Sequence, residues 1–569
     1  MGVFFNGRLW VSPATMSVID DSAMYNKNLS VGNVLAVMGA SVGGKPNTAL
    51  RFGSASEARA ALVDGDLLRA IEKAFDPSSQ TSGPATVIGV RVNPAVQATL
   101  AIKDISAATV INLVSTDYGL YTNQIKVKVE AGSVSGRKLT TQFGNSYFSA
   151  DNIARNALAL QYTGAQATAN ISVTNTTVTL AAPAGTTVAT LDLNVFSTVQ
   201  QLVDRINAVA DFTASVTDGN GQKPALNGLD TITAVSCKLA YVVTADLQAQ
   251  IDWLNGSEAY VTATRAANVG TVPAVMPFAY LAGGSDGITT NNEWSNVFTV
   301  LQTEDVQWVV PVSSVPAIHA MTDTHCSFMS NVGRMERRAI VGGVSGSADS
   351  VASAAAKALN SDRTSYVHLG FYDYNAAGSL VLFEPPILAA MLAGMFSGVN
   401  PGTALTNKTF KARGLERKLK NPTDTDQLIN GGVLCVEDTP KGYKVVKSIT
   451  TWLVNTNYNR VEVSTGVACD FVSRNVRNAL DDLRGQKGSP ELLIQAVSRV
   501  DTALRALALP EPMGPAVIVG DKVNPAFKNI SASLNGDVLS VEFQCSPVVP
   551  CNYIPVVVHA VPYSGSATA

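Results

Sequence analysis

The sequence is poor in charged side chains and contains no long apolar run. Only 15% of its 569 residues are Asp, Glu, Lys or Arg, and the formal net charge is −3. This composition gives no overall electrostatic attraction to nucleic acid or to an anionic membrane surface. The most apolar stretch, Ile387 to Val399, is shorter than the roughly 18 residues of a membrane span, and we expect a buried helix there. We therefore expect protein surfaces as partners, with no direct nucleic acid and no membrane insertion.

Cysteine and histidine are also scarce, with six and four residues respectively. The cysteines are scattered and include no CxxC pair, which favours reduced thiols in a cytosolic product. His319, His325 and Cys326 fall on one predicted helix, but residues six apart on a helix lie on different faces and cannot hold one metal ion together. We expect no metal site, no cofactor, and packing or surface roles for these side chains.

One glycine-rich segment resembles a phosphate-binding loop. Gly39 to Lys45 follows a predicted buried strand and matches the first seven places of GxxxxGK[ST]. The eighth residue is Pro46, which has neither a hydroxyl for magnesium nor an amide hydrogen for phosphate. We interpret the segment as a strand-exit loop and expect no enzyme activity. A nucleotide hydrolase remains the alternative from another functional class.

Two regions of the chain alternate between strand and helix patterns. Asn33 to Ala40 and Ala85 to Val92 are buried-strand runs, and a helix with a capping box at Ser54 and Glu57 lies between them. Such a β-α-β unit predicts parallel strands. The same alternation returns from Val306. The pattern predicts an α/β core formed by two separate stretches of the chain.

The segment between these regions is rich in Thr, Val, Ala and Asn and has many short alternating runs. Gln124 to Ala131 and Ala169 to Ala182 are examples, and one helix is expected at Thr198 to Ala210. We interpret it as one or two β-rich domains inserted into the core. The predicted boundaries are 1–22 for an amino-terminal arm, 23–104 for the first core part, 105–281 for the insertion, 282–540 for the second core part, and 541–569 for a carboxy-terminal arm.

The end of the chain predicts two strands. Val538 to Cys545 alternates apolar and polar residues, whereas Tyr553 to Val561 is apolar on both faces and contains Pro555. A strand of the second kind suits a sheet edge or an arm laid against another sheet. Before it, Arg474 to Leu483 and Pro490 to Leu507 predict amphipathic helices.

Several stretches, in order along the chain, resemble the sheath proteins of contractile bacteriophage tails. The resemblance covers both core parts and the end of the chain, whereas much of Leu160 to Ala263 has no counterpart. The matching stretches are LRFGSASEARAAL (Leu50 to Leu62), GPATVIGVRVNP (Gly83 to Pro94), DYGLYTNQIKVKV (Asp117 to Val129), YLAGGSDG (Tyr280 to Gly287), ALNSDR (Ala358 to Arg363), YDYNAAGSLVL (Tyr372 to Leu382), PGTALTNK (Pro401 to Lys408), GLERKL (Gly414 to Leu419), ITTWLVNTN (Ile449 to Asn457), RVEVSTGVACDFV (Arg460 to Val472), GQKGSP (Gly485 to Pro490) and VVPCNYIPVVVHA (Val548 to Ala560).

The resemblance implies a mixed α+β multidomain fold, in which an α/β sheath core carries an inserted β-rich domain and extended terminal β-arms. It implies a structural subunit that polymerises as stacked hexameric rings around an inner tail tube and contracts to drive the tube through the host envelope. The implied partners are further copies of the chain, the inner tail tube protein, and baseplate and tail terminator proteins. The implied location is the virion tail, after assembly in the host cytoplasm. A phage-derived bacteriocin or a secretion-type machine is the alternative context.

The resemblance also implies roles for particular residues. The terminal arms would add strands to a sheet of a neighbouring subunit. The expected arm residues are Val3, Phe4, Phe5, Leu9, Trp10 and Val11 at the amino end, and Tyr553, Ile554, Val556, Val557 and Val558 at the carboxy end. Expected contacts to the tube or ring are Arg474, Arg477, Asp481, Asp482, Arg484 and Lys487. A host-binding role for the insertion is a third hypothesis.

Overall fold

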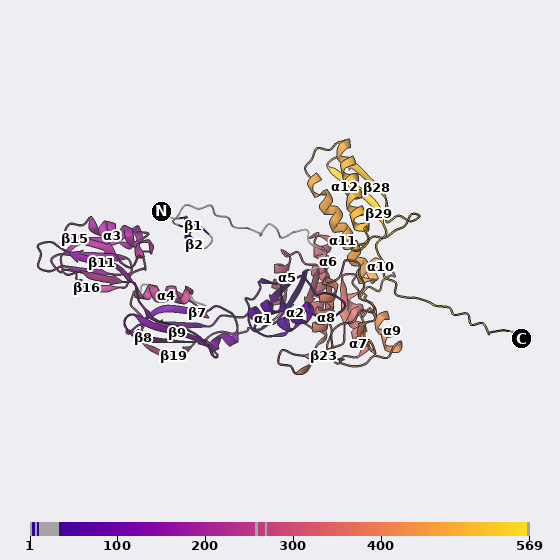
Figure 1. The fold of residues 1–569 in the computed structure, drawn as a ribbon, viewed down its shortest axis with the longest axis horizontal. Helices are drawn as coiled ribbons and strands as arrows, with labels where there is room; N and C mark the ends of the chain where they lie inside the picture. The colour runs from indigo at the N-terminus through magenta and orange to yellow at the C-terminus, as the bar shows by residue number, and fades with distance from the viewer. Residues whose placement is uncertain (1–2, 6–7, 11–33, 257–259, 268–269, 566–569) are drawn as a thin grey trace.

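The computed structural model shows an elongated molecule in three parts (Figure 1). The inserted β-rich region lies at one end, the α/β core lies towards the other, and a module of helices and a β-hairpin projects sideways from the core. The structure describes residues 3–5, 8–10, 34–256, 260–267 and 270–565. Within these residues, no helix is long and apolar enough to cross a membrane.

The core is a six-stranded sheet with the strand order β22-β21-β20-β3-β5-β4. All neighbours are parallel except β4, which runs antiparallel to β5 at the sheet edge. The expected parallel β-α-β unit is confirmed, because β3 and β5 pair in parallel. The strands are β3 (Val34–Gly39), β4 (Ala49–Phe52), β5 (Thr86–Arg91), β20 (Trp308–Pro311), β21 (Arg338–Gly342) and β22 (Thr364–Val367).

Helices cover both faces of this sheet. One face packs against α1 (Ala55–Leu62), α2 (Asp66–Phe75), α7 (Asp349–Leu359) and α8 (Pro385–Ser397). The other packs against α5 (Asn291–Leu301) and α6 (Pro316–Asn331). Every residue of α8 is buried, as expected for its apolar sequence. Smaller core elements are β23 (Phe371–Tyr374), β24 (Leu380–Phe383), β25 (Gly414–Leu415), α9 (Thr423–Asn430), β26 (Val436–Thr439), β27 (Gly442–Val445) and α10 (Tyr458–Val461).

The single helix expected between Ser54 and Pro77 is wrong, since the chain forms α1 and α2 there. The break lies at Val63 and Gly65, whose φ angles are +64° and +116°. A Cβ at Gly65 would lie 2.8 Å from the Cα of Ser41, so only glycine fits this approach to the loop after β3.

The insertion consists of two β-rich units. The unit next to the core contains β6 (Thr99–Lys103), β7 (Thr109–Ser115), β8 (Lys126–Ala131), β9 (Arg137–Phe143), β10 (Ser146–Ile153), α4 (Asp246–Gly256), β18 (Val261–Arg265) and β19 (Met276–Tyr280). The outer unit contains β11 (Asn156–Tyr162), β12 (Asn170–Val173), β13 (Thr177–Ala181), β14 (Thr187–Asp192), α3 (Val199–Asn207), β15 (Phe212–Val216), β16 (Ile232–Ser236) and β17 (Tyr241–Thr244). Each unit has its own apolar core.

The insertion begins earlier than the predicted residue 105, because β6 pairs with β7 and belongs to its sheet. The two connections to the core run side by side, with antiparallel bridges joining Val96 to Ser285 and Thr99 to Ala282. Their backbone hydrogen bonds include Val96 N–H to Ser285 O at 2.8 Å and Thr99 N–H to Ala282 O at 2.8 Å. The insertion therefore leaves and re-enters the core through one paired stalk.

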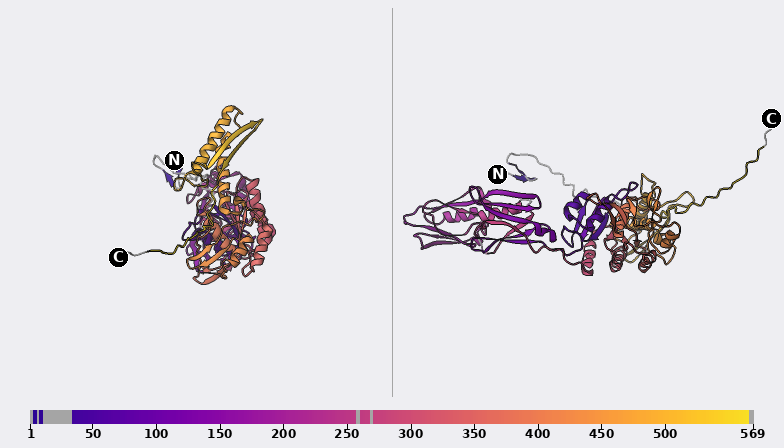
Figure 2. Two further views of the ribbon diagram at one scale, coloured as in Figure 1. Left: turned by 90° about the vertical axis from the view of Figure 1, so that its right-hand side faces the viewer. Right: turned by 90° about the horizontal axis from the view of Figure 1, so that it is seen from below.

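The projecting module consists of α11 (Val463–Leu480), α12 (Pro490–Ala508), β28 (Phe527–Asn535) and β29 (Val538–Cys545). The predicted boundary at residue 541 is wrong, since it would cut β29, which is paired with β28 along its length. The predicted strand from Tyr553 to Val561 forms no strand within this chain, and the segment runs away from the body (Figures 1 and 2). Its sequence has strand character, but no strand among the described residues pairs with it.

Candidate assembly surfaces

The β28–β29 hairpin is a two-stranded sheet with one covered face. Side chains alternate along both strands, and the inward set packs against α12 and the end of α11. The inward set includes Phe527, Ile530, Leu539, Val541 and Phe543. Within the described part of the chain, no further strand pairs with the outer edge of either strand. Each edge therefore offers unpaired backbone groups to an added strand.

The carboxy-terminal segment is an apolar strip without cover in the subunit. Its apolar side chains are between 76% and 83% exposed. They are Tyr553, Ile554, Val556, Val557, Val558 and Val561. The base of the segment is fixed, because Asn552 donates from Nδ2 to Glu462 Oε1 at 2.8 Å and Thr465 Oγ1 donates to Val548 O at 3.1 Å. The strip thus leaves the body at the beginning of α11.

The expected amino-terminal arm is described only at residues 3–5 and 8–10, which form two short strands. β1 (Val3–Phe5) and β2 (Arg8–Trp10) form an antiparallel hairpin, with Phe4 opposite Leu9. The sequence between them is Asn6-Gly7, a dipeptide strongly preferred in two-residue hairpin connections, so the signal was present. Val11 lies outside the described residues.

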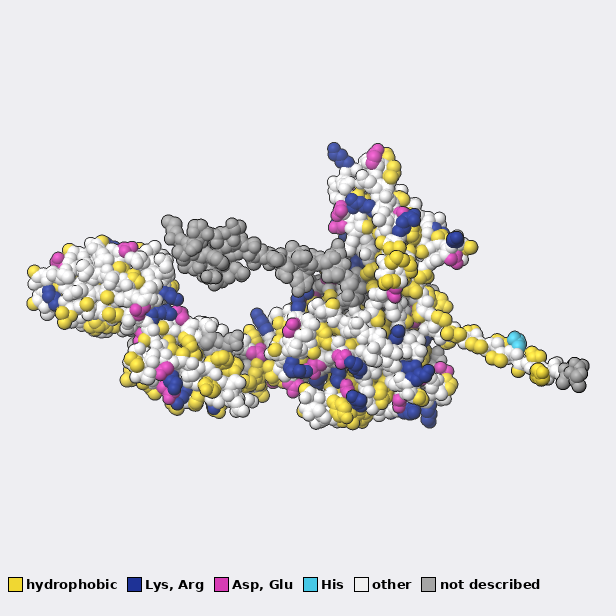
Figure 3. Space-filling view, in the orientation of Figure 1, with side chains coloured by type: hydrophobic (Ala, Val, Ile, Leu, Met, Phe, Trp, Pro, Cys, Tyr) yellow, Lys and Arg dark blue, Asp and Glu magenta, His cyan; other side chains and the backbone are white. Residues whose placement is uncertain are grey.

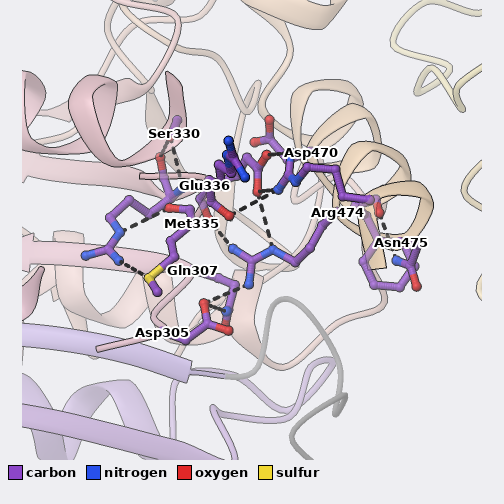
Figure 4. A network of polar contacts seen from close by, with 12 residues as sticks. Asp305, Gln307, Ser330, Met335, Glu336, Asp470, Arg474 and Asn475 are labelled. Atoms are coloured by element: carbon purple, nitrogen blue, oxygen red, sulfur yellow. Dashed lines mark hydrogen bonds and ion pairs between the residues drawn. The ribbon is translucent and has the colours of Figure 1, made fainter. Parts of the chain in front are cut away.

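Two of the six expected tube or ring contacts are instead engaged within the subunit (Figure 4). Arg474 is only 7% exposed; it donates to Asp305 Oδ1 at 2.7 Å and to the carbonyl of Glu336 at 3.0 Å. Arg477 donates to both carboxylate oxygens of Glu336 at 2.5 and 2.6 Å. The resemblance implied contacts outside the subunit for both arginines, but their partner carboxylates lie in the same chain, more than 130 residues away in sequence.

A second ion cluster reinforces the same junction. Asp470 on α11 accepts hydrogen bonds from Arg338 Nε at 2.9 Å and from Arg363 Nη1 at 2.7 Å. Both arginines belong to the core and are largely buried. The labelled Asp305, Glu336, Asp470 and Arg474 lie close together in Figure 4, so α11 is attached to the core sheet by charge as well as by apolar packing.

The other four expected contacts lie at the connection between α11 and α12. Asp481, Asp482, Arg484 and Lys487 are exposed. Asp481 pairs with Arg484, and Asp482 lies 3.2 Å from Arg499. These residues form the tip of the projecting module (Figures 1 and 3), and in this position they are free to meet another protein.

α12 also has an outward apolar stripe that the sequence interpretation missed. Leu493, Ile494 and Val497 line a shallow surface hollow, and Ile494 is largely exposed. The signal was the unbroken apolar run Leu492 to Ile494, because three consecutive apolar residues cannot all face one side of a helix.

The phosphate-loop resemblance has no matching geometry. The amides of the loop already donate within the chain: Ser41 to Asn93 Oδ1, Val42 to the carbonyl of Asp64, Gly43 to the carbonyl of Leu62, and Gly44 to Asp117 Oδ1. The segment after the loop is the strand β4 and not a helix. A phosphate would have to displace these acceptors, including a carboxylate.

His319, His325 and Cys326 are buried within the core. His319 Nε2 lies 2.9 Å from the carbonyl of Ser313, and His325 Nε2 lies 3.0 Å from Arg337 Nη1. Burial is the main reason that the pKa of His325 is lowered to about 3 and that of Cys326 is raised to about 12. All six cysteines are free thiols. In the part of the chain that the structure describes, no cluster of three or more His, Cys, Asp or Glu could hold a metal ion.

Comparison with known proteins identifies the family. The chain is 30% identical to the tail sheath protein of Bacillus phage SP01, over all of this chain and 98% of that protein. The chain belongs to the contractile phage tail sheath family. A putative tail sheath protein of Enterococcus phage phiEF24C is 29% identical, over 83% of this chain and 84% of that protein. No family model matches the chain.

Two solved structures of sheath tail proteins have the same fold as this chain. A sheath tail protein from Listeria innocua matches with a TM-score of 0.54 at 14% identity, over 92% of this chain and 94% of that one. One from Desulfitobacterium hafniense matches with a TM-score of 0.53 at 11% identity, over 94% of this chain and all of that one. The predicted mixed α+β multidomain fold is therefore confirmed. Tail sheath proteins are components of the virion tail, and this sheath protein has the same structural role.

Proposed function

We propose that this sheath protein polymerises as stacked hexameric rings around the inner tail tube and that contraction of the polymer drives the tube through the host envelope. One observation carries the proposal. Each subunit has an uncovered apolar carboxy-terminal strip and also a two-stranded sheet whose edges are open. A donor strand and an acceptor edge on the same chain allow the contact to repeat from subunit to subunit without end.

The proposed link is strand addition to the β28–β29 hairpin of a neighbour. Each backbone hydrogen bond formed in this way contributes about 0.5–1.5 kcal/mol, and each buried valine or isoleucine side chain about 1.5–3 kcal/mol. Backbone pairing is indifferent to side-chain identity. The anchored base at Val548 to Asn552 would let the strip stay paired while the bodies of the two subunits rotate. The β1–β2 hairpin is the proposed counterpart at the amino end.

Contraction would then need two packings of one folded subunit and no nucleotide. Energy would be stored in the extended lattice and released as subunits form further contacts. The loop after β3 supports a role without catalysis, because its amides already donate to Asn93, Asp117 and two backbone carbonyls. We propose that the sheath protein is not an enzyme.

The tip of the projecting module is the proposed contact with the inner tail tube or an adjacent ring. Asp481, Asp482, Arg484 and Lys487 are exposed there, with both signs of charge. Baseplate and tail terminator proteins are the proposed partners at the two ends of the sheath, and assembly is proposed to occur in the host cytoplasm. Because the relatives named above come from phages, a virion tail is favoured over a bacteriocin or secretion machine.

Deletion of residues 553–569 tests the proposal. The truncated protein should remain folded, because the deleted side chains have no cover in the subunit, and negative-stain micrographs should show no long striated tubes. Deletion of residues 564–569 alone is the control and should still permit tubes. Normal sheaths from the longer truncation would contradict the link through the carboxy-terminal strip.

A further inference from the structure

The exposed aromatic side chains of the insertion gather on one surface. Among its described residues, the large aromatics that remain exposed are Tyr147 (67%), Tyr280 (60%) and Phe278 (39%). All three lie on the outward face of the four-stranded sheet with the order β10-β9-β8-β19. The opposite face of this sheet supplies Val127, Val129 and Leu139 to the apolar core of the unit, so the aromatics are not needed for folding.

The strand register places four side chains in a line across this face. Tyr147 is opposite Gln142, Gln142 is opposite Lys126, and Lys126 is opposite Tyr280. Neighbouring strands are about 4.8 Å apart, so the two tyrosines at the ends of the line are separated by about 14 Å. A second line beside it contains Ser149, Thr140 and Lys128.

The centre of the face is polar and cationic. Lys126 Nζ lies 4.8 Å from the ring centre of Phe278 and 5.9 Å from that of Tyr280, and no carboxylate of the described residues lies within 4 Å of it. Thr140 and Ser149 have their hydroxyls 2.9 Å apart. Lys128 and Lys138 share the single carboxylate of Glu130, at 2.7 and 3.7 Å.

We propose that this face, formed by Tyr147, Gln142, Lys126, Tyr280 and Phe278, binds an anionic polysaccharide. Aromatic rings about 14 Å apart provide stacking surfaces for the apolar faces of two separate sugar rings. The amide and hydroxyl groups between them match sugar hydroxyls, and the amine of Lys126 matches a carboxylate, sulfate or phosphodiester on the polymer.

The same features disfavour two other occupants. The core of a protein interface is depleted in charged residues, whereas an amine lies at the centre of this face. Single-stranded nucleic acid is bound in grooves of dense positive charge, whereas two of the lysines on this face are paired with the carboxylate of Glu130. The unit also lies away from the projecting module and the carboxy-terminal strip, so the face is separate from the proposed strand-addition contact between them (Figures 1 and 2).

Affinity electrophoresis of the full-length protein tests this inference. The gels contain polygalacturonate, dextran sulfate or a phosphodiester-linked polysaccharide, with neutral dextran as the matched uncharged polymer. We expect retardation by at least one anionic polymer and not by dextran. The double variant Tyr147→Ala/Tyr280→Ala should weaken retardation at least tenfold, and Lys126→Gln should weaken it several-fold. Tyr374→Ala, which removes an exposed tyrosine of β23 in the core, should leave it unchanged.

Three results would overturn the inference: no retardation by any of the anionic polymers, equal retardation of the double variant, or binding of a single-stranded DNA oligonucleotide in preference to all the polysaccharides. Electron micrographs of the same variants should show normal sheath assembly. A loss of assembly in the double variant would instead identify the face as a contact between subunits. The result is therefore independent of the proposed strand addition.

Discussion

Arg477 and Glu336 form a two-point ion pair that joins α11 to the core, with N–O distances of 2.5 and 2.6 Å. Glu336 is buried, and its Oε2 also lies 3.4 Å from Arg474 Nε. One carboxylate thus lies between two guanidinium groups at the base of the projecting module, and Asp305 supplies the second negative charge.

Glu336→Ala should destabilise the protein strongly, because it leaves Arg474 buried and Arg477 without its carboxylate. Removing one member of a buried ion pair typically costs about 3–5 kcal/mol. Urea unfolding followed by circular dichroism measures the change. Arg484→Ala, which breaks only the exposed pair with Asp481, should cost less than about 1 kcal/mol. Equal effects of the two substitutions would contradict the role assigned to Glu336.

Arg91→Leu should loosen the insertion. The fully buried guanidinium of Arg91 donates to the carbonyls of Gly44 and Tyr118 at 2.9 and 3.0 Å and to Asp286 at 3.1 Å, so it joins the core sheet to the inserted unit and to the end of the returning connection. We expect limited proteolysis to release the insertion at least several-fold faster. Arg51→Leu, at an exposed edge position, is the control. An unchanged cleavage rate would show that the backbone pairing of the stalk is sufficient.

Val556→Asp/Val558→Asp should abolish sheath assembly without unfolding the subunit. Both side chains are exposed in the isolated chain, so the free energy of unfolding should change by less than about 0.5 kcal/mol. In the assembled state, two carboxylates would be buried between strands. Sedimentation and micrographs measure assembly. Val523→Asp, in an exposed loop, should assemble normally.

The stability of the protein should fall as the pH falls below about 6.5. Burial and the neighbouring Arg337 lower the pKa of His325 to about 3 in the folded state, whereas an unfolded histidine titrates near 6.5. Between these values the unfolded chain binds the extra proton, so His325 lowers stability by about 1.4 kcal/mol per pH unit down to about pH 3. His325→Gln should reduce this slope in urea titrations at several pH values. His559→Gln, in the exposed carboxy-terminal strip, should not.

Magnesium ATP should not bind the loop after β3. Its amides from Ser41 to Gly44 are paired within the chain. We expect the same melting temperature with and without millimolar nucleotide, in both the wild-type protein and Lys45→Ala. A nucleotide-dependent rise that Lys45→Ala removes would contradict the non-enzymatic role.

Local patterns predicted much of the fold. Buried-strand runs predicted β3 and β5, the apolar run predicted α8, and alternation predicted β29. The errors arose where a distant segment decides the outcome. The helix is interrupted at Gly65, where the backbone lies against Ser41 in the loop after β3. The chain that follows this loop pairs with the edge of the sheet as β4.

The candidate contacts were less predictable for the same reason. Arg474 lies in α11 and Asp481 directly follows it. Arg474 is hydrogen-bonded to Asp305, which is distant in sequence, whereas Asp481 remains exposed. Sequence periodicity predicts which residues share one face of a helix. It does not predict which distant segment packs against that face. The apolar stripe of α12 could have been predicted from the local run Leu492 to Ile494.

The paired stalk at Val96 and Ser285 has an evolutionary consequence. Because entry and exit of the insertion are neighbours, a short turn could join them and leave the core sheet unbroken. A change in the inserted units then need not disturb the packing of the core sheet or of the projecting module. A single recombination event could therefore exchange the whole insertion and keep the core and the projecting module of the sheath protein.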